Sequence, residues 1–247
     1  MSPCLLRRSF AVATLLAASS IVLAHAVAAP VTDCNSDVYS SNSHPKGHSY
    51  GEWSASWWTW MMGLPLADHP ATDTANFDIT EGQTGDVWFL TAPFGTTTRT
   101  GTIPKGKYLF LGLLNVEGSS LEVDDSGNLM STEAAQRAYA KEYADLIDPS
   151  SLFCTIDGDD VTGLGGFRCT SPQFSFTAPS PWLFGSTGGT GTSCADGYFL
   201  FLKKLKAGTH TIHYGGSFVF PDGSTASIDM TYVLTQQGGG KGGGGDD

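Results

Sequence analysis

The C-terminal third of the sequence consists of short segments with strand character separated by turn residues, and no other feature limits the possible folds as strongly. β-Branched and aromatic residues fill 198–203, 209–214, 217–220 and 226–235. The pairs Ala207-Gly208, Gly215-Gly216 and Asp222-Gly223 separate these segments. Glycine-containing pairs of this kind make the tight turns that join neighbouring antiparallel strands. This part of the chain therefore predicts a β-sheet built from hairpins.

Strand patterns also occur earlier in the chain, at 86–91, 107–114, 151–156 and 173–178. The last of these, QFSFTA, alternates polar with aromatic residues, as expected for a strand with one buried face. Eight or so short strands separated by Gly, Pro and Thr favour a mainly β fold. We expect a β-sandwich or a jelly-roll-like domain.

Two short accessory helices interrupt the strands. In 50–64, Trp53, Trp57, Trp60 and Leu64 recur at helical spacing. The second helix is expected after Ser131 and Thr132, with Pro149 ending it.

The N-terminus has the three parts of a secretory signal peptide, predicted at 1–28. Arg7 and Arg8 precede an apolar run at 11–24, which is shorter than a membrane span, and small residues follow at the expected cleavage sites. We expect an irregular arm at 29–49, a β-rich domain at 50–236 and a disordered glycine-rich tail at 237–247. A secreted or periplasmic location follows, with no transmembrane segment after signal cleavage.

Four cysteines would remain in the exported protein: Cys34, Cys154, Cys169 and Cys194. An even number in an oxidising compartment indicates two disulfides. A turn-rich stretch separates Cys154 from Cys169, which favours a bond between them and, by elimination, one between Cys34 and Cys194. The other two connectivities stay open.

The formal net charge of −11 and the lack of a basic stripe argue against nucleic acid as a partner. Two acidic stretches offer closely spaced oxygens that suit calcium, although ordinary turns explain them as well. Three histidines near the first helix are candidates for zinc or copper. These residues are Asp124, Asp125, Ser126 and Asn128; Asp157, Asp159 and Asp160; and His44, His48 and His69.

Tryptophan suggests a binding surface, because its flat ring matches the C–H face of a sugar. Trp58 should point away from the apolar face of its helix, and Trp182 lies in the loop-like stretch SPSPWLFG. We expect these two rings, with Glu52 and His69 as polar neighbours, to be the ligand-binding candidates. Core packing is the alternative, and it is favoured for Trp53, Trp57 and Trp60.

Familiar catalytic motifs were not found, so no catalytic residue is predicted. A polysaccharide hydrolase or lyase would need two converging carboxylates, or a carboxylate with His69 or His213. The available carboxylates are Glu52, Glu117, Glu122, Asp196 and Asp229.

Several strings along 50–235 resemble a group of uncharacterised exported bacterial proteins: YGEWSASWWTW, QTGDVWFLTAPFG, IPKGKYLF with LLNVE, FRCTSPQFSF, DGYFLFLKKLKAGTHTIHYGG and IDMTYVLT. The resemblance implies export and a shared β-rich fold, and it transfers no catalytic residue. It also implies that relatives carry a cysteine pair near the positions of Ile79 and Gly101.

Three hypotheses follow in order of preference. The first is a secreted non-enzymatic binding module for a glycan or a cell-envelope surface. The second is a secreted polysaccharide hydrolase or lyase, and the third is a structural envelope protein.

Overall fold

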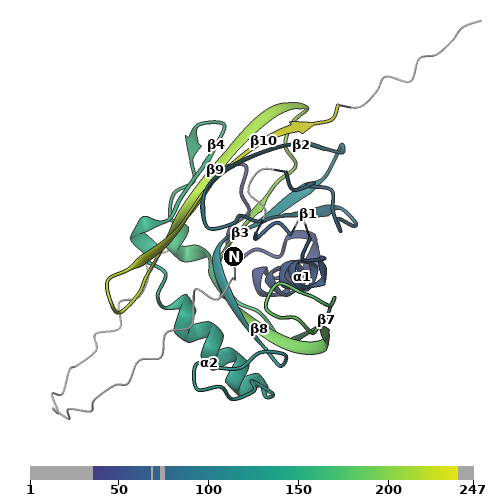
Figure 1. Ribbon diagram of the computed structural model, residues 1–247. Helices are drawn as coiled ribbons and strands as arrows, with labels where there is room; N and C mark the ends of the chain where they lie inside the picture. The colour runs from purple at the N-terminus through teal and green to yellow at the C-terminus, as the bar shows by residue number, and fades with distance from the viewer. Residues whose placement is uncertain (1–35, 68, 73–75, 239–247) are drawn as a thin grey trace, which may run out of the picture.

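The computed structural model describes residues 36–67, 69–72 and 76–238. Two five-stranded sheets and two α-helices form its main elements (Figure 1). The predicted signal peptide, Cys34 and residues 239–247 of the predicted tail lie outside the described residues. Within them, no helix is both long and apolar enough to cross a bilayer.

The first sheet, sheet A, has the strand order β1-β3-β8-β6, and β7 also pairs with β8. Because β8 is fourteen residues long, its beginning can pair with β7 and its middle with β6. A bridge between Val38 and Leu202 ties the predicted N-terminal arm to the same strand. The strands are β1 (Val87–Leu90), β3 (Tyr108–Ser119), β6 (Arg168–Thr170), β7 (Phe174–Ala178) and β8 (Gly189–Leu202).

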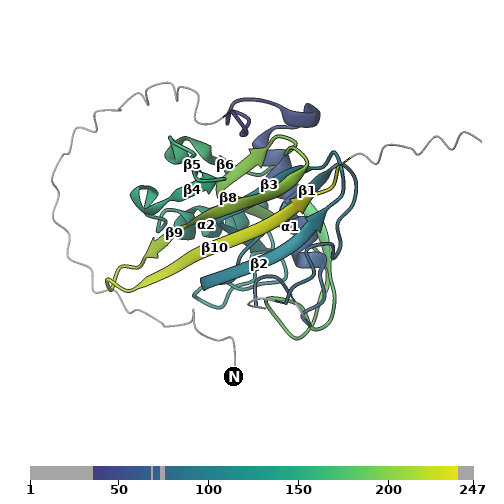
Figure 2. The same cartoon turned by 90° about the horizontal axis from the view of Figure 1, so that it is seen from above.

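The second sheet, sheet B, has the order β2-β10-β9-β4-β5. Its centre is the long antiparallel hairpin of β9 and β10, and β2 lies parallel to β10 at one edge (Figure 2). The strands are β2 (Gly95–Ile103), β4 (Phe153–Ile156), β5 (Asp159–Asp160), β9 (Gly208–Val219) and β10 (Thr225–Gln236).

The helices and sheets stack in layers, which confirms the predicted sandwich with two accessory helices. One face of sheet A is covered by α1 (Tyr50–Gly63), and the other face is covered by sheet B and α2 (Glu133–Ala144), as Figure 1 shows. Short 3₁₀ helices lie at η1 (Pro45–Gly47), η2 (Pro149–Ser151) and η3 (Leu164–Phe167).

Burial on both faces explains why β3 and β8 are almost continuously apolar. Phe110 of β3 stacks on Phe199 of β8, with ring centroids 5.4 Å apart, on the side that α1 covers. Alternation along a strand turns the neighbouring Leu111 and Leu200 toward sheet B. A strand enclosed in this way loses the polar alternation of a half-exposed strand, and KYLFLGLL has none.

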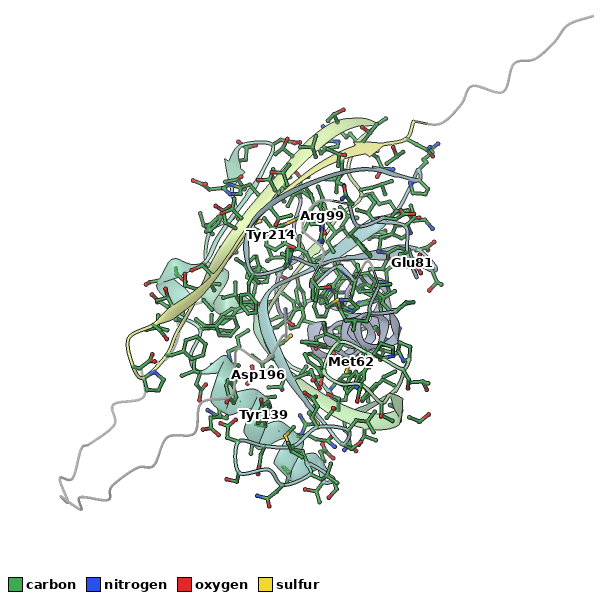
Figure 3. All side chains as sticks on the ribbon, in the orientation of Figure 1. Met62, Glu81, Arg99, Tyr139, Asp196 and Tyr214 are labelled. Atoms are coloured by element: carbon green, nitrogen blue, oxygen red, sulfur yellow. The ribbon has the colours of Figure 1, made fainter. Side chains whose placement is uncertain are left out.

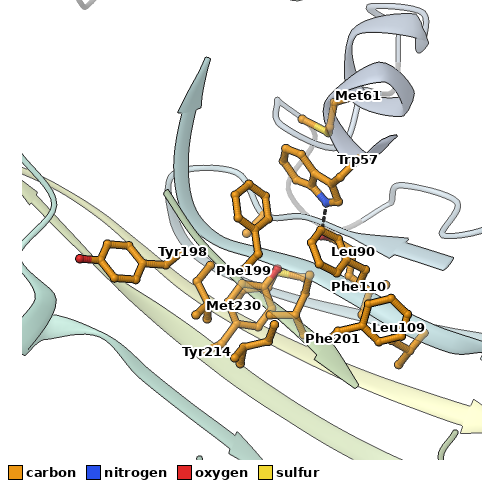
Figure 4. Packing of buried hydrophobic residues seen from close by; sticks show 14 of the residues in the cluster. Trp57, Met61, Leu90, Leu109, Phe110, Tyr198, Phe199, Phe201, Tyr214 and Met230 are labelled. Carbon is orange, nitrogen blue, oxygen red and sulfur yellow. Dashed lines mark hydrogen bonds between the residues drawn. The ribbon is translucent and has the colours of Figure 1, made fainter. Parts of the chain in front are cut away.

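Local sequence signals start α1, and one indole anchors it. Ser49 caps the helix and forms a capping box with Glu52. The Trp57 ring lies over Gly112 of β3, where a Cβ atom would come within 2.9 Å of its Cζ2 atom. Its Nε1–H group donates a hydrogen bond of 2.9 Å to the Leu90 carbonyl (Figure 4). Glycine at 112 is therefore a packing requirement.

Two elements differ from the sequence predictions. The expected turn at Gly215-Gly216 lies inside β9, because these glycines let β9 approach β10: a Cβ on Gly215 would collide with the Ile228 carbonyl oxygen. Strand β2 was not predicted, since its polar sequence GTTTRTGTI shows no apolar alternation.

The expected Cys154–Cys169 disulfide is wrong for this structure. Cys154 lies on β4 in sheet B and Cys169 on β6 in sheet A, so the intervening turns do not fold their strands together. Both are free thiols, as is Cys194, which is buried beside Gln136 of α2. The expected partner of Cys194 is Cys34, which lies outside the described residues.

Ile79 and Gly101 are neighbours, although they are well separated in the chain. A Cβ atom built on Gly101 would lie 3.6 Å from the Ile79 Cβ atom. Disulfides typically have a Cβ–Cβ separation of about 3.5–4.5 Å. These two positions can therefore accommodate either an isoleucine packed against a glycine or a pair of disulfide-bonded cysteines.

We expect the double variant Ile79→Cys with Gly101→Cys to form a disulfide on oxidation. The bond should raise the free energy of unfolding by about 3 kcal/mol over the reduced double variant, because it restricts the unfolded chain. Urea unfolding with and without reductant measures the difference. Ile79→Cys alone serves as the control. Failure of the double variant to cross-link within one chain would contradict the proximity of these positions.

Candidate functional site

In the structure, the two tryptophans that were expected to be exposed for ligand binding are buried. Trp58 is 6% exposed and Trp182 is 2% exposed. The segment after β7 folds over this flank of α1, so that Phe184 packs against both indoles, at centroid distances of 6.3 Å and 5.3 Å. Their expected exposure is therefore wrong, and neither ring offers a free face to a sugar.

The two polar candidates have structural roles. His69 is buried; its Nε2–H group donates to the Met61 carbonyl, while Nδ1 accepts from the Ala71 amide. Burial lowers the pKa of His69, which keeps the ring neutral. Glu52 accepts a hydrogen bond from the Ser49 backbone amide, and this bond lowers the pKa of its carboxyl group.

An open groove of about 920 Å³ instead runs along a different flank of α1. We call it the α1 groove. One wall is the helix itself, from Trp53 to Leu64, and the other wall is the segment 82–89, which leads into β1. Lys46 and His48 also line the groove.

Aromatic rings make the apolar part of the α1 groove. Trp53 and Phe89 are partly buried, and the Trp60 ring lies 5.7 Å from Phe89. The N–H groups of both indoles are already used: Trp53 donates to the Pro45 carbonyl and Trp60 to the Glu81 carbonyl. Trp60 itself is only 8% exposed, so the exposed parts of Trp53 and Phe89 are what these rings offer a ligand, as apolar contact and not as a hydrogen-bond donor.

Those two indole bonds also fix the walls. The Glu81 side chain points outward at the edge of the molecule, beyond α1 (Figure 3), while its carbonyl holds Trp60. Gln83 bonds through its side chain to the Phe89 amide and carbonyl groups, at 2.9 Å and 2.8 Å. The segment 82–89 is thus tied both to α1 and to itself.

Lys46 and His48 each contact an acidic side chain. Lys46 Nζ lies 3.0 Å from Asp86 Oδ2, and this contact lowers the pKa of Asp86 and raises the pKa of Lys46. His48 Nδ1 lies 3.9 Å from Glu52 Oε1. The α1 groove therefore has hydrogen-bonding groups without a strong excess of either charge.

Sequence reasoning missed most of this site. It placed Trp53 in the core, where the ring is in fact only partly buried, and it did not consider Lys46, Asp86 or Phe89. The pairing of Lys46 with Asp86 spans forty residues and has no local signal. The available hint was the turn-rich stretch EGQTGD immediately before the VWFL strand.

The acidic loops form turns that use their own oxygens. Asp124 Oδ1 accepts from the Ser126 and Asn128 amides at 2.9 Å and 2.8 Å. Asp157 accepts from the Thr211 amide and contacts the His210 ring. Within the described residues, no group of three or more His, Cys, Asp or Glu side chains is arranged to hold a metal ion. Calcium and the histidine metal site remain predictions without a site in this structure.

Among the candidate catalytic carboxylates, Glu117 and Glu122 lie close together. Glu117 is 4% exposed, and Ser193 Oγ donates to its Oε2 atom at 2.5 Å. Burial, followed by the proximity of Glu122, raises the pKa of Glu117 well above its usual range. Neither residue lines the α1 groove.

The remaining carboxylates are engaged elsewhere. Asp196 is buried and makes a two-pronged ion pair with Arg168, at 2.8 Å and 2.9 Å. Asp229 contacts His213 Nε2 at 2.7 Å on the outer face of sheet B. Glu52, Asp196 and Asp229 thus lie apart, each with its own partner.

Comparison with known proteins does not identify a family. No protein-family model matches the sequence, and no curated protein matches it significantly. A solved structure described as "Solution Structure of Amebosin" is 14% identical, with a TM-score of 0.21, and the match covers 62% of this chain and 100% of the other. A likeness at this level carries no conclusion about fold or function.

The buried Glu117 should make stability depend on pH. Because its folded pKa is raised, its contribution is fully present below the unfolded value of about 4.3 and is lost as the pH rises through the folded value. Each pKa unit by which the folded value exceeds the unfolded value corresponds to about 1.4 kcal/mol of stability.

We expect Glu117→Gln to gain stability relative to the wild type between pH 5 and pH 8, measured by urea unfolding. The control is Glu142→Gln, at an exposed site on α2. Parallel pH profiles for wild type and Glu117→Gln would contradict this role.

Proposed function

We propose that this protein is a secreted, non-enzymatic binding module that holds a glycan in the α1 groove. The observation that carries the proposal is the combination of partly buried aromatic rings, Trp53 and Phe89, with polar groups in one open groove. Sugar rings combine an apolar C–H face with peripheral hydroxyl groups, and this groove offers a partner to each.

The hydroxyl groups on the helix wall suit this role. Ser56 Oγ donates to the Glu52 carbonyl and Thr59 Oγ1 donates to the Ala55 carbonyl, at 3.0 Å and 2.8 Å. Each hydroxyl oxygen that donates in this way still has lone pairs, so it can accept a hydrogen bond from a sugar hydroxyl. Lys46 and Asp86, which also line the groove, supply a donor and an acceptor.

Binding without turnover fits the placement of the carboxylates. Most enzymes that hydrolyse a glycosidic bond use two carboxyl groups that flank the ligand. Asp86 is the acidic side chain among the residues that line the α1 groove, and it is paired with Lys46. Glu117 and Glu122 lie close together but outside this groove, so they do not favour the hydrolase or lyase alternative.

The test is to fill the groove from an exposed position of α1. Ser56→Tyr places a large ring in the α1 groove without removing a core side chain, since Ser56 is exposed. We expect affinity for a bound glycan to fall at least tenfold, measured by affinity electrophoresis against soluble polysaccharides and by pull-down on insoluble cellulose, chitin and peptidoglycan.

The matched control is Ala138→Tyr, which introduces the same side chain at an exposed position of α2. It should bind like the wild type. Equal binding by Ser56→Tyr and Ala138→Tyr would overturn the location of the site. If no glycan is retained by the wild-type protein, the proposed function itself is wrong.

A further inference from the structure

A second recess lies on the other flank of α1. It has a volume of about 370 Å³ and is lined by Thr59 of α1, Ser175, Phe176 and Thr177 of β7, and Thr190 of β8. We call it the β7 recess. Thr59 also lines the α1 groove. The two hollows therefore meet on the surface of the helix.

Small side chains lie on the exposed surface of α1 around Thr59, where the two hollows meet. Ser56, Thr59 and Gly63 fall within one narrow stripe of α1, because each residue advances the helix by about 100°, and all three are exposed. A Cβ atom on Gly63 would be 3.8 Å from the Thr177 carbonyl oxygen, so this end of the stripe reaches β7. In Figure 1, α1 accordingly runs between β1 and β7.

A path across α1 is longer than a single sugar ring. The α1 groove alone follows the helix from Trp53 to Leu64, about 16 Å at 1.5 Å per residue, and the β7 recess adjoins it at Thr59. A ligand that occupies both hollows must therefore be extended and must cross the helix at Thr59. The interior of a polymer chain fits such a path, because both of its ends continue beyond the site.

The charges along this path indicate a neutral ligand. Lys46 pairs with Asp86 in the α1 groove, and the side chains that line the β7 recess are hydroxyls and one phenyl ring. Thr177 Oγ1 and Thr190 Oγ1 lie 3.2 Å apart and can exchange hydrogen bonds with a sugar. The formal net charge of −11 disfavours anionic polymers over the whole surface.

We infer that the ligand is a neutral polysaccharide chain, bound at an internal position, which runs from the α1 groove across Thr59 into the β7 recess. This inference rests on the proposed function and adds the class and the path of the ligand. It also assigns a binding role to β7 and β8 at a place that holds none of the predicted site residues.

The experiment uses the neutral polymers xyloglucan, mixed-linkage β-glucan and galactomannan, together with fragments of increasing length made from each. For the wild-type protein, affinity should rise with fragment length and then level off once a fragment covers both hollows. Alginate and polygalacturonate, which are anionic, should bind at least tenfold more weakly than the preferred neutral polymer.

Thr190→Tyr fills the β7 recess from an exposed strand position, and Thr98→Tyr makes the same change at an exposed position of β2 in the other sheet. We expect Thr190→Tyr to weaken binding of long fragments at least fivefold and to leave the shortest fragments unchanged. Thr98→Tyr should match the wild type at every length.

Each of the other possible results would contradict one specific part of the proposal. If Thr190→Tyr binds long fragments as the wild type does, while Ser56→Tyr loses binding, the path is wrong and the proposed function stands. If affinity does not depend on length, the ligand is a chain end or a small sugar. Displacement of the polysaccharide by an unfolded neutral polypeptide would show that the occupant is a protein segment. Preference for an anionic polymer would exclude a neutral ligand.

Discussion

The contact between Trp57 and Gly112 is the one on which the rest of the structure depends. It joins three elements at one point, because the indole belongs to α1, the glycine to β3, and the carbonyl that accepts the indole N–H to Leu90 of β1. With α1 seated there, the aromatic face of sheet A is covered, and β3 and β8 can be apolar on both sides. The same seating fixes which flanks of α1 stay open. The candidate site is thus a by-product of how the helix is anchored.

The two flanks of α1 differ because different chain segments lie beside them: the segment that follows β7 on one flank, and the segment that leads into β1 on the other. On one side, the segment after β7 folds back and covers Trp58 with Phe184 and Trp182. On the other side, the hydrogen bond from Trp60 to the Glu81 carbonyl and the bond from the Gln83 side chain to the Phe89 carbonyl fix the position of the segment 82–89. An open groove remains between this segment and α1. The exposed stripe of small residues then links the groove to the recess beside β7.

Local sequence patterns predicted what depends on neighbours in the chain. The hairpin of β9 and β10, both helices and the apolar character of β3 could be predicted because turn residues, caps and periodicity specify them. Strand β2 could not, since its pairing is with β10, more than a hundred residues away. The burial of Trp58 and the ion pair between Lys46 and Asp86 also arise from contacts between residues distant in sequence. The expected exposure of Trp58 and Trp182 was wrong for that reason.

Because hydrogen bonds to backbone carbonyls hold the indoles of Trp53 and Trp60, the walls of the groove are set before any ligand arrives. Binding at such a site needs no closing step. A short ligand makes a single contact of this kind and diffuses away once it is released. A long chain with many equivalent segments would nevertheless keep the protein nearby, because release of one segment leaves the next at high local concentration. A rigid, open groove therefore suits residence on a polymer by repeated rebinding.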